Sequence, residues 1–315
     1  LLLGVTDPEE KRKTFPRLYP LGLGVISVAP IQMARAFAVF ANQGREVSPI
    51  AILQVEDRNG KIFLDPEKEL RLQQKRKGSS IQLISPQTAY VMTSLLEKTV
   101  QSGTLAYASG YGTKFTYTDS SGKKYTIPAA GKTGTTQNWA DAWTVGYTPY
   151  YTTAVWFGFD RPGNSLGVTQ TGATIAGPVW ANYMREVHRG LPMKDFVRPS
   201  TGLIDVTVCA KSGLLPTPYC NEGTVTLTFL EGTQPQQYCD IHDAGGQYTQ
   251  KALDIMKQDT IHIDDSELQN KLKMPTLNLD SLPSAKPANT PSNTTNGQGD
   301  TPSNPVNQEY NPLLD

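Results

Sequence analysis

The segment 130–136 reads Ala-Gly-Lys-Thr-Gly-Thr-Thr, and its residues could together bind a carboxylate. Lys132 supplies a cation that attracts an anion and favours deprotonation of a nearby hydroxyl. Thr133 and Thr135 carry hydroxyls that can donate hydrogen bonds. Gly134 has no side chain, so an extended substrate backbone could lie against this segment as an added strand. Taken alone, the tripeptide Lys-Thr-Gly is a weak signal and favours an ordinary edge strand with a solvated lysine.

Three cysteines form a second group with chemical potential. Cys209, Cys220 and Cys239 lie within one 31-residue stretch. One disulfide plus one free thiol is the simplest interpretation for an extracytoplasmic protein. Alternatively, Cys239 and His242 form a Cys-x-x-His pair that could join the other two cysteines around zinc. Because ten residues separate Cys209 from Cys220, the sequence favours a disulfide or unpaired thiols, and we predict neither a metal nor a cofactor.

Two serine–lysine pairs have the spacing Ser-x-x-Lys, in which the lysine could act as the base for a serine nucleophile. Ser120 and Lys123 are three residues apart, as are Ser121 and Lys124. Gly122 lies within both pairs and disfavours the helix that would aim serine and lysine together. We therefore expect the two lysines to be exposed loop charges.

Helical periodicity and turn residues predict the elements that precede the Lys-Thr-Gly segment. A helix is expected over 27–44, with Pro30 in its first turn. A hairpin is expected over 50–64, with a type I′ turn at Asn59-Gly60. A second helix is expected over 86–101, capped by Ser85. Its buried stripe should comprise Ala89, Met92, Leu95, Leu96 and Val100.

The segment 105–124 is rich in Gly, Ser, Thr, Tyr and Lys and predicts an exposed loop or ribbon. Three strands are expected over 125–135, 142–148 and 152–159, and their short connections favour antiparallel neighbours. A helix over 172–187 follows. This order predicts an α+β fold, with an antiparallel sheet covered by helices.

Three parts are expected along the chain. Residues 1–195 form the main domain, and 196–245 form a small cysteine-containing extension with strands at 203–208 and 224–229. Residues 246–315 form a linker and a tail rich in Pro, Ser, Asn and Thr, which we expect to be disordered. Acidic and basic residues balance at 29 each, which argues against nucleic acid as a partner. No run of eighteen apolar residues occurs, so no membrane span is expected.

Many blocks around the Lys-Thr-Gly segment resemble the class A, or bifunctional, penicillin-binding proteins. That segment is the third signature of the penicillin-recognising serine enzymes. The resemblance covers roughly residues 20–245, and its blocks in this chain are 23–24, 27–30, 33–37, 40–44, 55–61, 85–90, 103–104, 141–143, 146–149, 154–160, 212–215, 218–220 and 239–242.

The resemblance implies a penicillin-binding transpeptidase fold and a serine D,D-transpeptidase that cross-links peptidoglycan. Lys132 would be catalytic, and the substrate would contact Lys132, Thr133, Gly134, Thr135, Thr136 and Trp139. Peptidoglycan stem peptides and β-lactams would bind. An upstream glycosyltransferase domain and a membrane anchor would place the protein at the outer face of the cytoplasmic membrane.

The chain departs from the family pattern in its first two signatures. A helical Ser-x-x-Lys turn carrying the nucleophile should precede residue 20, followed by a Ser-x-Asn loop, and neither is found there. We therefore expect a fragment that starts at Leu1 within a longer protein. The alternative is a non-catalytic envelope module that binds peptidoglycan or a partner protein. A third possibility is a β-lactamase or carboxypeptidase, against which the C-terminal extension argues.

Overall fold

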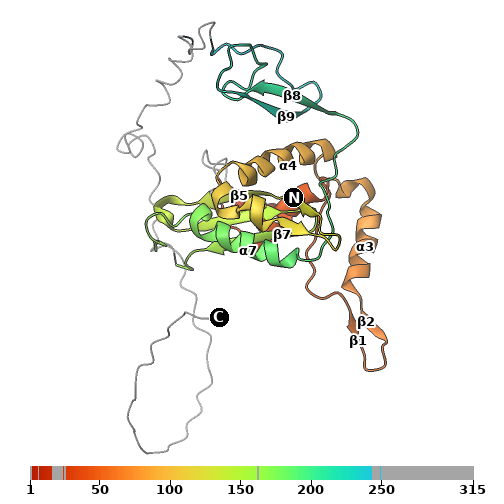
Figure 1. Cartoon of the computed structure of the whole chain (residues 1–315). Coiled ribbons are helices and arrows are strands. Elements are labelled where there is room, and N and C mark those ends of the chain that lie inside the picture. Colours follow the sequence, from red (N-terminus) through yellow and green to blue (C-terminus); the bar gives the residue numbers. More distant parts are fainter. Residues whose placement is uncertain are drawn as a thin grey trace, which may run out of the picture. The chain divides into compact units, whose positions relative to one another are not determined.

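A three-stranded antiparallel sheet forms the centre of the computed structural model, which describes residues 2–5, 7–15, 24, 26–161, 163–242 and 249. Its strands are β5 (Ala130–Thr135), β6 (Ala142–Tyr147) and β7 (Thr152–Phe157), in the order β5-β6-β7 (Figure 1). Short connections join them, which antiparallel pairing allows. The predicted α+β class is thus confirmed, whereas the predicted tail lies outside the described residues apart from Thr249.

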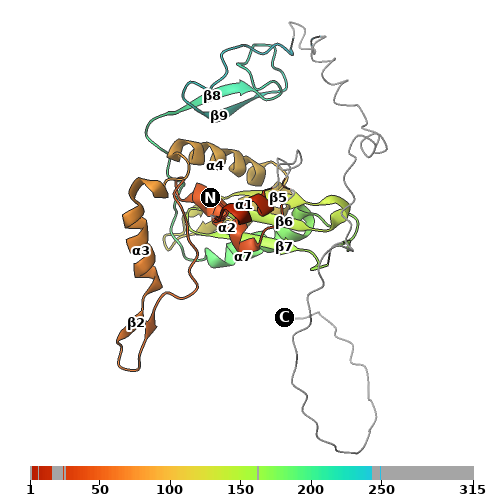
Figure 2. The same cartoon turned by 180° about the vertical axis from the view of Figure 1, so that it is seen from behind.

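Helices cover both faces of this sheet. Helix α2 (Pro30–Ala41) packs on β6 and β7 from one face. Helix α7 (Gly177–Val187), entered through a π-helical turn at Gly172–Ala176, packs on the opposite face, as the front and back views show (Figures 1 and 2). Helix α4 (Pro86–Gln101) packs beside β5. No helix among the described residues is long and apolar enough to cross a membrane.

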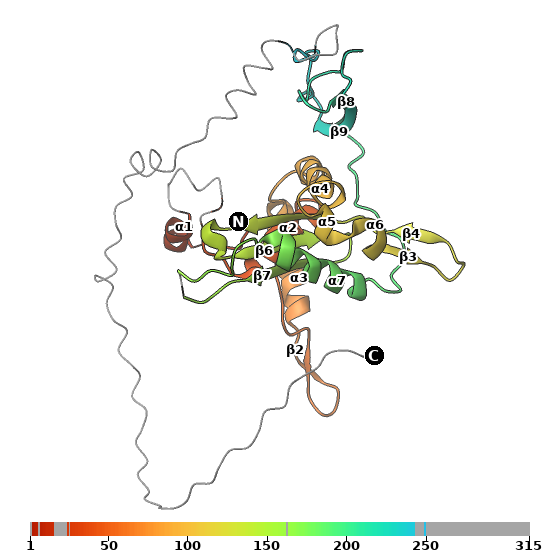
Figure 3. The ribbon, with the colours of Figure 1, turned by 60° about the vertical axis from the view of Figure 1, so that its left-hand side comes forward.

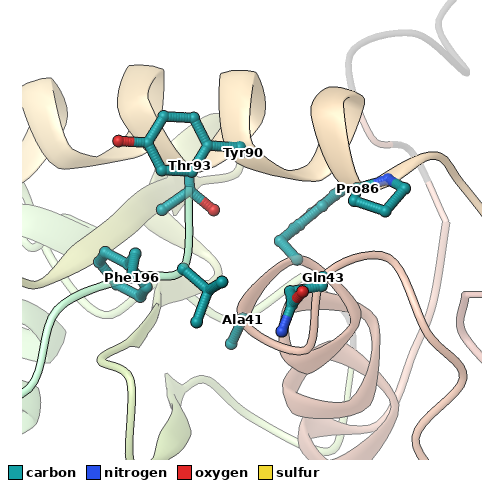
Figure 4. A pocket seen from close by; sticks show the side chains of 8 residues that line it. Ala41, Gln43, Pro86, Tyr90, Thr93 and Phe196 are labelled. Atoms are coloured by element: carbon teal, nitrogen blue, oxygen red, sulfur yellow. The ribbon is translucent and has the colours of Figure 1, made fainter. Parts of the chain in front are cut away.

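Tyr147 is the centre of the packing between α2, α4 and the sheet. It is fully buried, and its ring meets Phe37 and Phe196 edge-on at centroid distances of 6.3 and 5.6 Å. Its hydroxyl shares a 2.9 Å hydrogen bond with the hydroxyl of Thr93 on α4. Figure 4 shows Thr93 and Phe196 in the narrow space where α4 faces the end of α2 at Ala41. This contact fixes α4 against the sheet.

Helix α4 has the predicted bounds, and the Ser85 side chain accepts a hydrogen bond from the Thr88 backbone N–H, as expected of a cap. The predicted buried stripe is only partly correct. Ala89, Leu96 and Val100 are buried, but Met92 and Leu95 are 38% and 50% exposed. Thr93 is buried in their place because its hydroxyl satisfies the Ala89 carbonyl and Tyr147.

The prediction of an exposed loop over 105–124 was wrong. This segment contains α5 (Ala106–Ser109), α6 (Tyr111–Lys114) and strand β3 (Thr116–Thr118), which pairs with β4 (Lys124–Thr126). Leu105 and Phe115 are fully buried, and Phe115 lies 5.5 Å from the Trp180 ring of α7. Tertiary packing of these few apolar residues overrides the polar composition of the segment.

The predicted hairpin forms with shorter strands, β1 (Val55–Glu56) and β2 (Ile62–Leu64), so residues 50–54 are not part of a strand. Its turn is not type I′, because only Gly60 (φ +78°) has a positive φ, whereas type I′ requires Asn59 to have one too. The carboxylate of Asp57 instead accepts from the backbone N–H groups of Asn59 and Lys61.

Two helices lack an apolar stripe and escaped prediction. They are α1 (Pro8–Thr14) and α3 (Pro66–Lys77), which is followed by a 3₁₀ turn at Gly78–Ile81. Both begin with an aspartate that caps the helix and a proline in the first turn. Neither helix buries a residue, so hydrophobic periodicity could not reveal them. The capping aspartate and the first-turn proline are the sequence signals that mark where each helix begins.

The C-terminal hairpin consists of β8 (Leu203–Cys209) and β9 (Thr224–Leu230), which pair along their full length (Figure 3). Both predicted strands are therefore confirmed, each extended by one residue.

Candidate functional site

Strand β5 borders a cleft of about 520 Å³. Lys132 and Gly134 occupy alternate positions on the strand, so they share one face of the sheet. Their partners on β6 are Val145 and Trp143. These residues line the cleft together with Met33 and Phe37 of α2 and Trp156 of β7.

Two tryptophans lie on this face of the sheet. Trp143 and Trp156 are half-buried cleft residues, with ring centroids 6.2 Å apart. The antiparallel register pairs Gly134 with Trp143 and Trp143 with Trp156, so the three residues form a row across the sheet.

The Lys132 side chain is exposed, and its ammonium donates a 2.8 Å hydrogen bond to the backbone carbonyl of Thr133. An ammonium carries three donors, so this bond leaves capacity for an anion in the cleft. The geometry therefore holds a positive charge beside the backbone of β5.

Thr133 and Thr135 direct their hydroxyls to other elements. The Thr133 hydroxyl lies 3.1 Å from the hydroxyl of Thr104, and the Thr135 hydroxyl accepts a 3.1 Å hydrogen bond from the Gly172 N–H. Because a hydroxyl that accepts can still donate, Thr135 retains a proton for a bound oxygen. Both residues border the cleft.

Gly172 lets the π-helical turn lie directly against the sheet. A Cβ at this position would lie 2.1 Å from the Trp143 carbonyl oxygen and 2.6 Å from that of Gly134. The Gly172 carbonyl in turn accepts a 2.9 Å hydrogen bond from the Thr144 hydroxyl. The strand that carries Lys132 is thus backed by tightly packed backbone.

Asp141 joins the ends of all three strands. Its carboxylate accepts hydrogen bonds from the Thr136 hydroxyl at 2.9 Å and from the Trp156 indole N–H at 2.8 Å. The Asp141 backbone N–H also donates to the Thr136 hydroxyl at 2.8 Å. The Thr136 hydroxyl is therefore engaged as both donor and acceptor within the protein.

Trp139 lies outside the set of residues that line the cleft. It belongs to a 3₁₀ turn, Gln137–Trp139, and has a left-handed backbone with φ of +51°. Its carbonyl accepts a hydrogen bond from the Leu166 N–H at 2.8 Å. Its predicted contact with substrate stays a prediction.

The serines with motif-like spacing lie outside any catalytic arrangement. Ser120 and Ser121 are exposed in the β3–β4 turn, where the Ser121 hydroxyl donates to Asp119 at 2.6 Å. Ser165 stands in a Gly-x-Ser-x-Gly sequence over 163–167, but no strand or helix begins or ends there. Its hydroxyl donates to the Asn138 carbonyl at 2.6 Å.

His188 is a structural residue. Its imidazole is buried, with Nε2 2.7 Å from the Thr148 hydroxyl and Nδ1 2.6 Å from the Met184 carbonyl. Burial lowers the pKa of His188, although its bond to the Met184 carbonyl acts in the opposite direction. Neither Thr148 nor Met184 lines the cleft.

The β8–β9 hairpin brings the cysteines together despite their separation in sequence. Ligand atoms of Cys209, Cys220, Cys239 and His242 all lie within 4.8 Å of one another. The spacing argument against a shared site was therefore wrong, because the hairpin closes the ten-residue gap.

Two family models match the chain. The model described as penicillin binding protein transpeptidase domain matches residues 7–185, and the model of the C-terminal domain of penicillin-binding protein 1A matches 199–244. Penicillin-binding protein 1A of Clostridium tetani is 33% identical over 224 residues, covering 70% of this chain and 25% of the relative. That of Aquifex aeolicus is 35% identical over 223 residues, covering 70% and 27%.

A solved structure shares the fold. The crystal structure of penicillin-binding protein 1A from Haemophilus influenzae aligns with a TM-score of 0.57 and 25% identity, covering 73% of this chain and 36% of that one. The chain thus spans about a quarter of the length of the curated relatives cited above. With the transpeptidase model matching more than half of the chain, this protein belongs to the penicillin-binding protein transpeptidase family, as a class A transpeptidase portion.

Proposed function

We propose that this chain supplies the substrate-binding strand of a D,D-transpeptidase that cross-links peptidoglycan through a serine acyl-enzyme. The observation that carries the proposal is Lys132, an exposed cation on β5 that faces the cleft between the sheet and α2. Thr133 and Thr135 follow it on the same strand and add two hydroxyls. A stem peptide ends in a carboxylate and is extended, and this strand presents groups suited to both features.

The reaction is acyl transfer in two steps. A serine oxygen attacks the carbonyl carbon of the penultimate D-alanine, the peptide C–N bond breaks, and the terminal D-alanine leaves with a proton on its nitrogen. An amine of a neighbouring stem then attacks the ester carbonyl, forms the cross-link and returns a proton to the serine. No metal or cofactor takes part in these steps.

The residues of β5 take distinct roles in this scheme. Lys132 attracts the terminal carboxylate and favours proton transfer from the serine. Thr133 and Thr135 donate hydrogen bonds to that carboxylate, and Gly134 lets the peptide backbone approach. The backbone N–H of Thr135 forms an oxyanion hole with the N–H of the serine itself.

The serine nucleophile belongs, in this proposal, to a Ser-x-x-Lys helix elsewhere in the same protein. The only Ser-x-x-Lys sequences in this chain are the two in the exposed turn over 120–124. The parent protein would also carry a glycosyltransferase domain and an anchor at the outer face of the cytoplasmic membrane. β-Lactams would acylate the same serine.

Acylation by a fluorescent penicillin tests the proposal. In the parent protein, Lys132→Ala is expected to slow covalent labelling by roughly 100-fold or more, because it removes a charge that stabilises the transition state. Lys124→Ala is the matched control, since Lys124 is exposed at the start of β4, and labelling should be unchanged.

A second comparison separates the rival functions. This chain alone should remain unlabelled, whereas the parent protein should label. If neither labels while both are folded, the chain is a non-catalytic module that binds peptidoglycan or a protein. Labelling of this chain alone, abolished by Ser120→Ala or Ser121→Ala, would place the nucleophile in the β3–β4 turn.

A further inference from the structure

In the C-terminal unit, residues 199–242, the end of one strand and two loops converge on one point. Cys209 ends β8, Cys220 lies in the loop before β9, and Cys239 and His242 lie in the loop after it. The Sγ atoms of Cys239 and Cys209 are 3.2 and 3.7 Å from Nδ1 of His242. All four ligand atoms lie within 4.8 Å of one another.

We propose that this cluster is a structural zinc site formed by the thiolates of Cys209, Cys220 and Cys239 and by Nδ1 of His242. Four-coordinate sites with three cysteines and one histidine are a standard structural arrangement for zinc. Zinc–sulfur bonds of about 2.3 Å and a zinc–nitrogen bond of about 2.0 Å place tetrahedral ligand atoms roughly 3.5–3.8 Å apart. The two sulfur–nitrogen distances, 3.2 and 3.7 Å, lie on either side of about 3.5 Å, the value expected for a sulfur and a nitrogen on one zinc.

A disulfide cannot account for all four groups. It would join two of the three thiols and leave the third beside a buried imidazole at the same point. None of the three cysteines is paired in the structure, and Cys209 and Cys239 are buried. Zinc uses every member of the set: each thiol releases its proton to solvent, and the neutral imidazole donates a lone pair from Nδ1.

Backbone hydrogen bonds help to position two of the cysteines. The Thr217 N–H donates to Sγ of Cys220 at 3.3 Å. The Cys239 N–H donates to the Leu215 carbonyl at 2.7 Å, which ties the loop after β9 to the segment that precedes Cys220.

The other side of the imidazole faces a carboxylate. Nε2 of His242 lies 4.0 Å from Oε1 of Glu222, and Oε2 of Glu222 lies 3.0 Å from the Lys211 ammonium. A zinc-bound histidine usually presents its second nitrogen to such a carboxylate, which fixes the tautomer. Three thiolates with Zn²⁺ leave one net negative charge, and Lys211 offsets the added charge of Glu222.

The burial pattern gives an independent reason for a metal. Among described residues 199–242, the buried ones are Val208, Cys209, Cys239 and His242. Three of these four are cluster members, so the interior of the unit is the cluster and not an apolar core. Units of this size commonly depend on a metal or disulfide for stability.

Metal content of the purified full chain tests the proposal directly. After incubation with zinc under reducing conditions and removal of free metal, mass spectrometry should detect one tightly held zinc per chain. Replacement by Co²⁺ should give the absorption of a tetrahedral cobalt–thiolate centre. Cys220→Ser and His242→Ala should abolish tight binding, whereas Thr226→Ser, an exposed change on β9, should leave it intact.

Two further variants keep the test decisive if the first ones fail to fold. His242→Cys should retain one zinc with a four-thiolate cobalt spectrum, and Glu222→Gln should weaken zinc affinity about tenfold. Chelation should remove amide-exchange protection from β8 and β9 but not from β5–β7. A folded, reduced chain without zinc, zinc that survives Cys220→Ser, or an intact-mass shift showing a native disulfide would each overturn the proposal.

Discussion

The indole N–H of Trp156 donates a 2.8 Å hydrogen bond to the carboxylate of Asp141. The bond links two neighbouring strands, because Trp156 lies on β7 and Asp141 lies just before β6. Since the same carboxylate accepts from the Thr136 hydroxyl at the end of β5, one side chain fixes three strand ends at the cleft. Asp141 thus shapes the site through its hydrogen bonds.

Asp141→Ala should lower the free energy of unfolding by about 1–3 kcal/mol, because the half-buried indole N–H of Trp156 and the exposed hydroxyl of Thr136 lose their acceptor. Asp141→Asn retains one acceptor oxygen and should cost less. Urea unfolding of both variants checks this ordering. Equal stability of Asp141→Ala and the unaltered chain would show that water replaces the carboxylate without cost.

Gly172→Ala should be strongly destabilising, by about 2 kcal/mol or more, because the new methyl would collide with two backbone carbonyls of β5 and β6. Gly112→Ala is a matched control in α6, where a Cβ meets nothing within 4 Å and should stabilise the helix by roughly 0.5–1 kcal/mol. Thermal unfolding should therefore shift in opposite directions. A small shift for Gly172→Ala would mean that the π-helical turn can move off the sheet.

Glu97 predicts a pH-dependent stability. Burial raises its pKa to about 7, and the nearby Asp195 carboxylate adds to the rise while Lys98 opposes it. Because the folded-state pKa exceeds the unfolded value of 4.5, the folded chain loses stability as pH rises from about 4.5 through 7. The loss is at most about 3 kcal/mol.

Glu97→Gln should remove this loss and make the chain more stable than the unaltered one at pH 8. Unfolding measured at pH 5 and pH 8 tests it. His188, whose lowered pKa destabilises the chain as pH falls, is common to both proteins and cancels in the comparison. An equal pH slope in the two proteins would show that Glu97 is solvated.

Tyr147→Phe should cost only about 0.5–1.5 kcal/mol, because the Thr93 hydroxyl keeps its bond to the Ala89 carbonyl. Tyr147→Ala should cost roughly 3–5 kcal/mol, since it empties the space between α2, α4 and the sheet. Tyr107→Phe, at a fully exposed tyrosine, should change nothing. If Tyr147→Phe costs as much as Tyr147→Ala, the hydroxyl pair and not the ring holds α4 in place.

Sequence signals within a single segment predicted the secondary structure of that segment. Ser85 and Pro86 located the start of α4, and strand-like runs separated by short connections located β5–β7 and the two strands of the β8–β9 hairpin. Sequence reasoning failed where tertiary contacts decide. Leu105 and Phe115 are buried in a cluster completed by residues much later in the chain, such as Trp180 and Met184.

In the candidate sites too, local sequence predicted some features and tertiary contacts decided the others. Lys132, Thr133 and Thr135 are close in sequence, so their shared strand was predictable. The cleft walls were not, because they combine α2 with two later strands. Likewise the cysteine cluster depends on the β8–β9 register, which pairs Cys209 with Thr224 and so brings Cys220 back toward β8.

The placement of the tryptophans also gives the protein a built-in optical reporter. Trp143 and Trp156 lie next to each other at the cleft, whereas Trp180 is a fully buried residue of α7. Indole emission shifts with the polarity around the ring, so a ligand that displaces water from β5 should change the emission of the cleft pair and leave that of Trp180 unchanged. Occupancy of the site can then be followed in unlabelled protein, with Trp180 as an internal reference that reports whether the fold itself is intact.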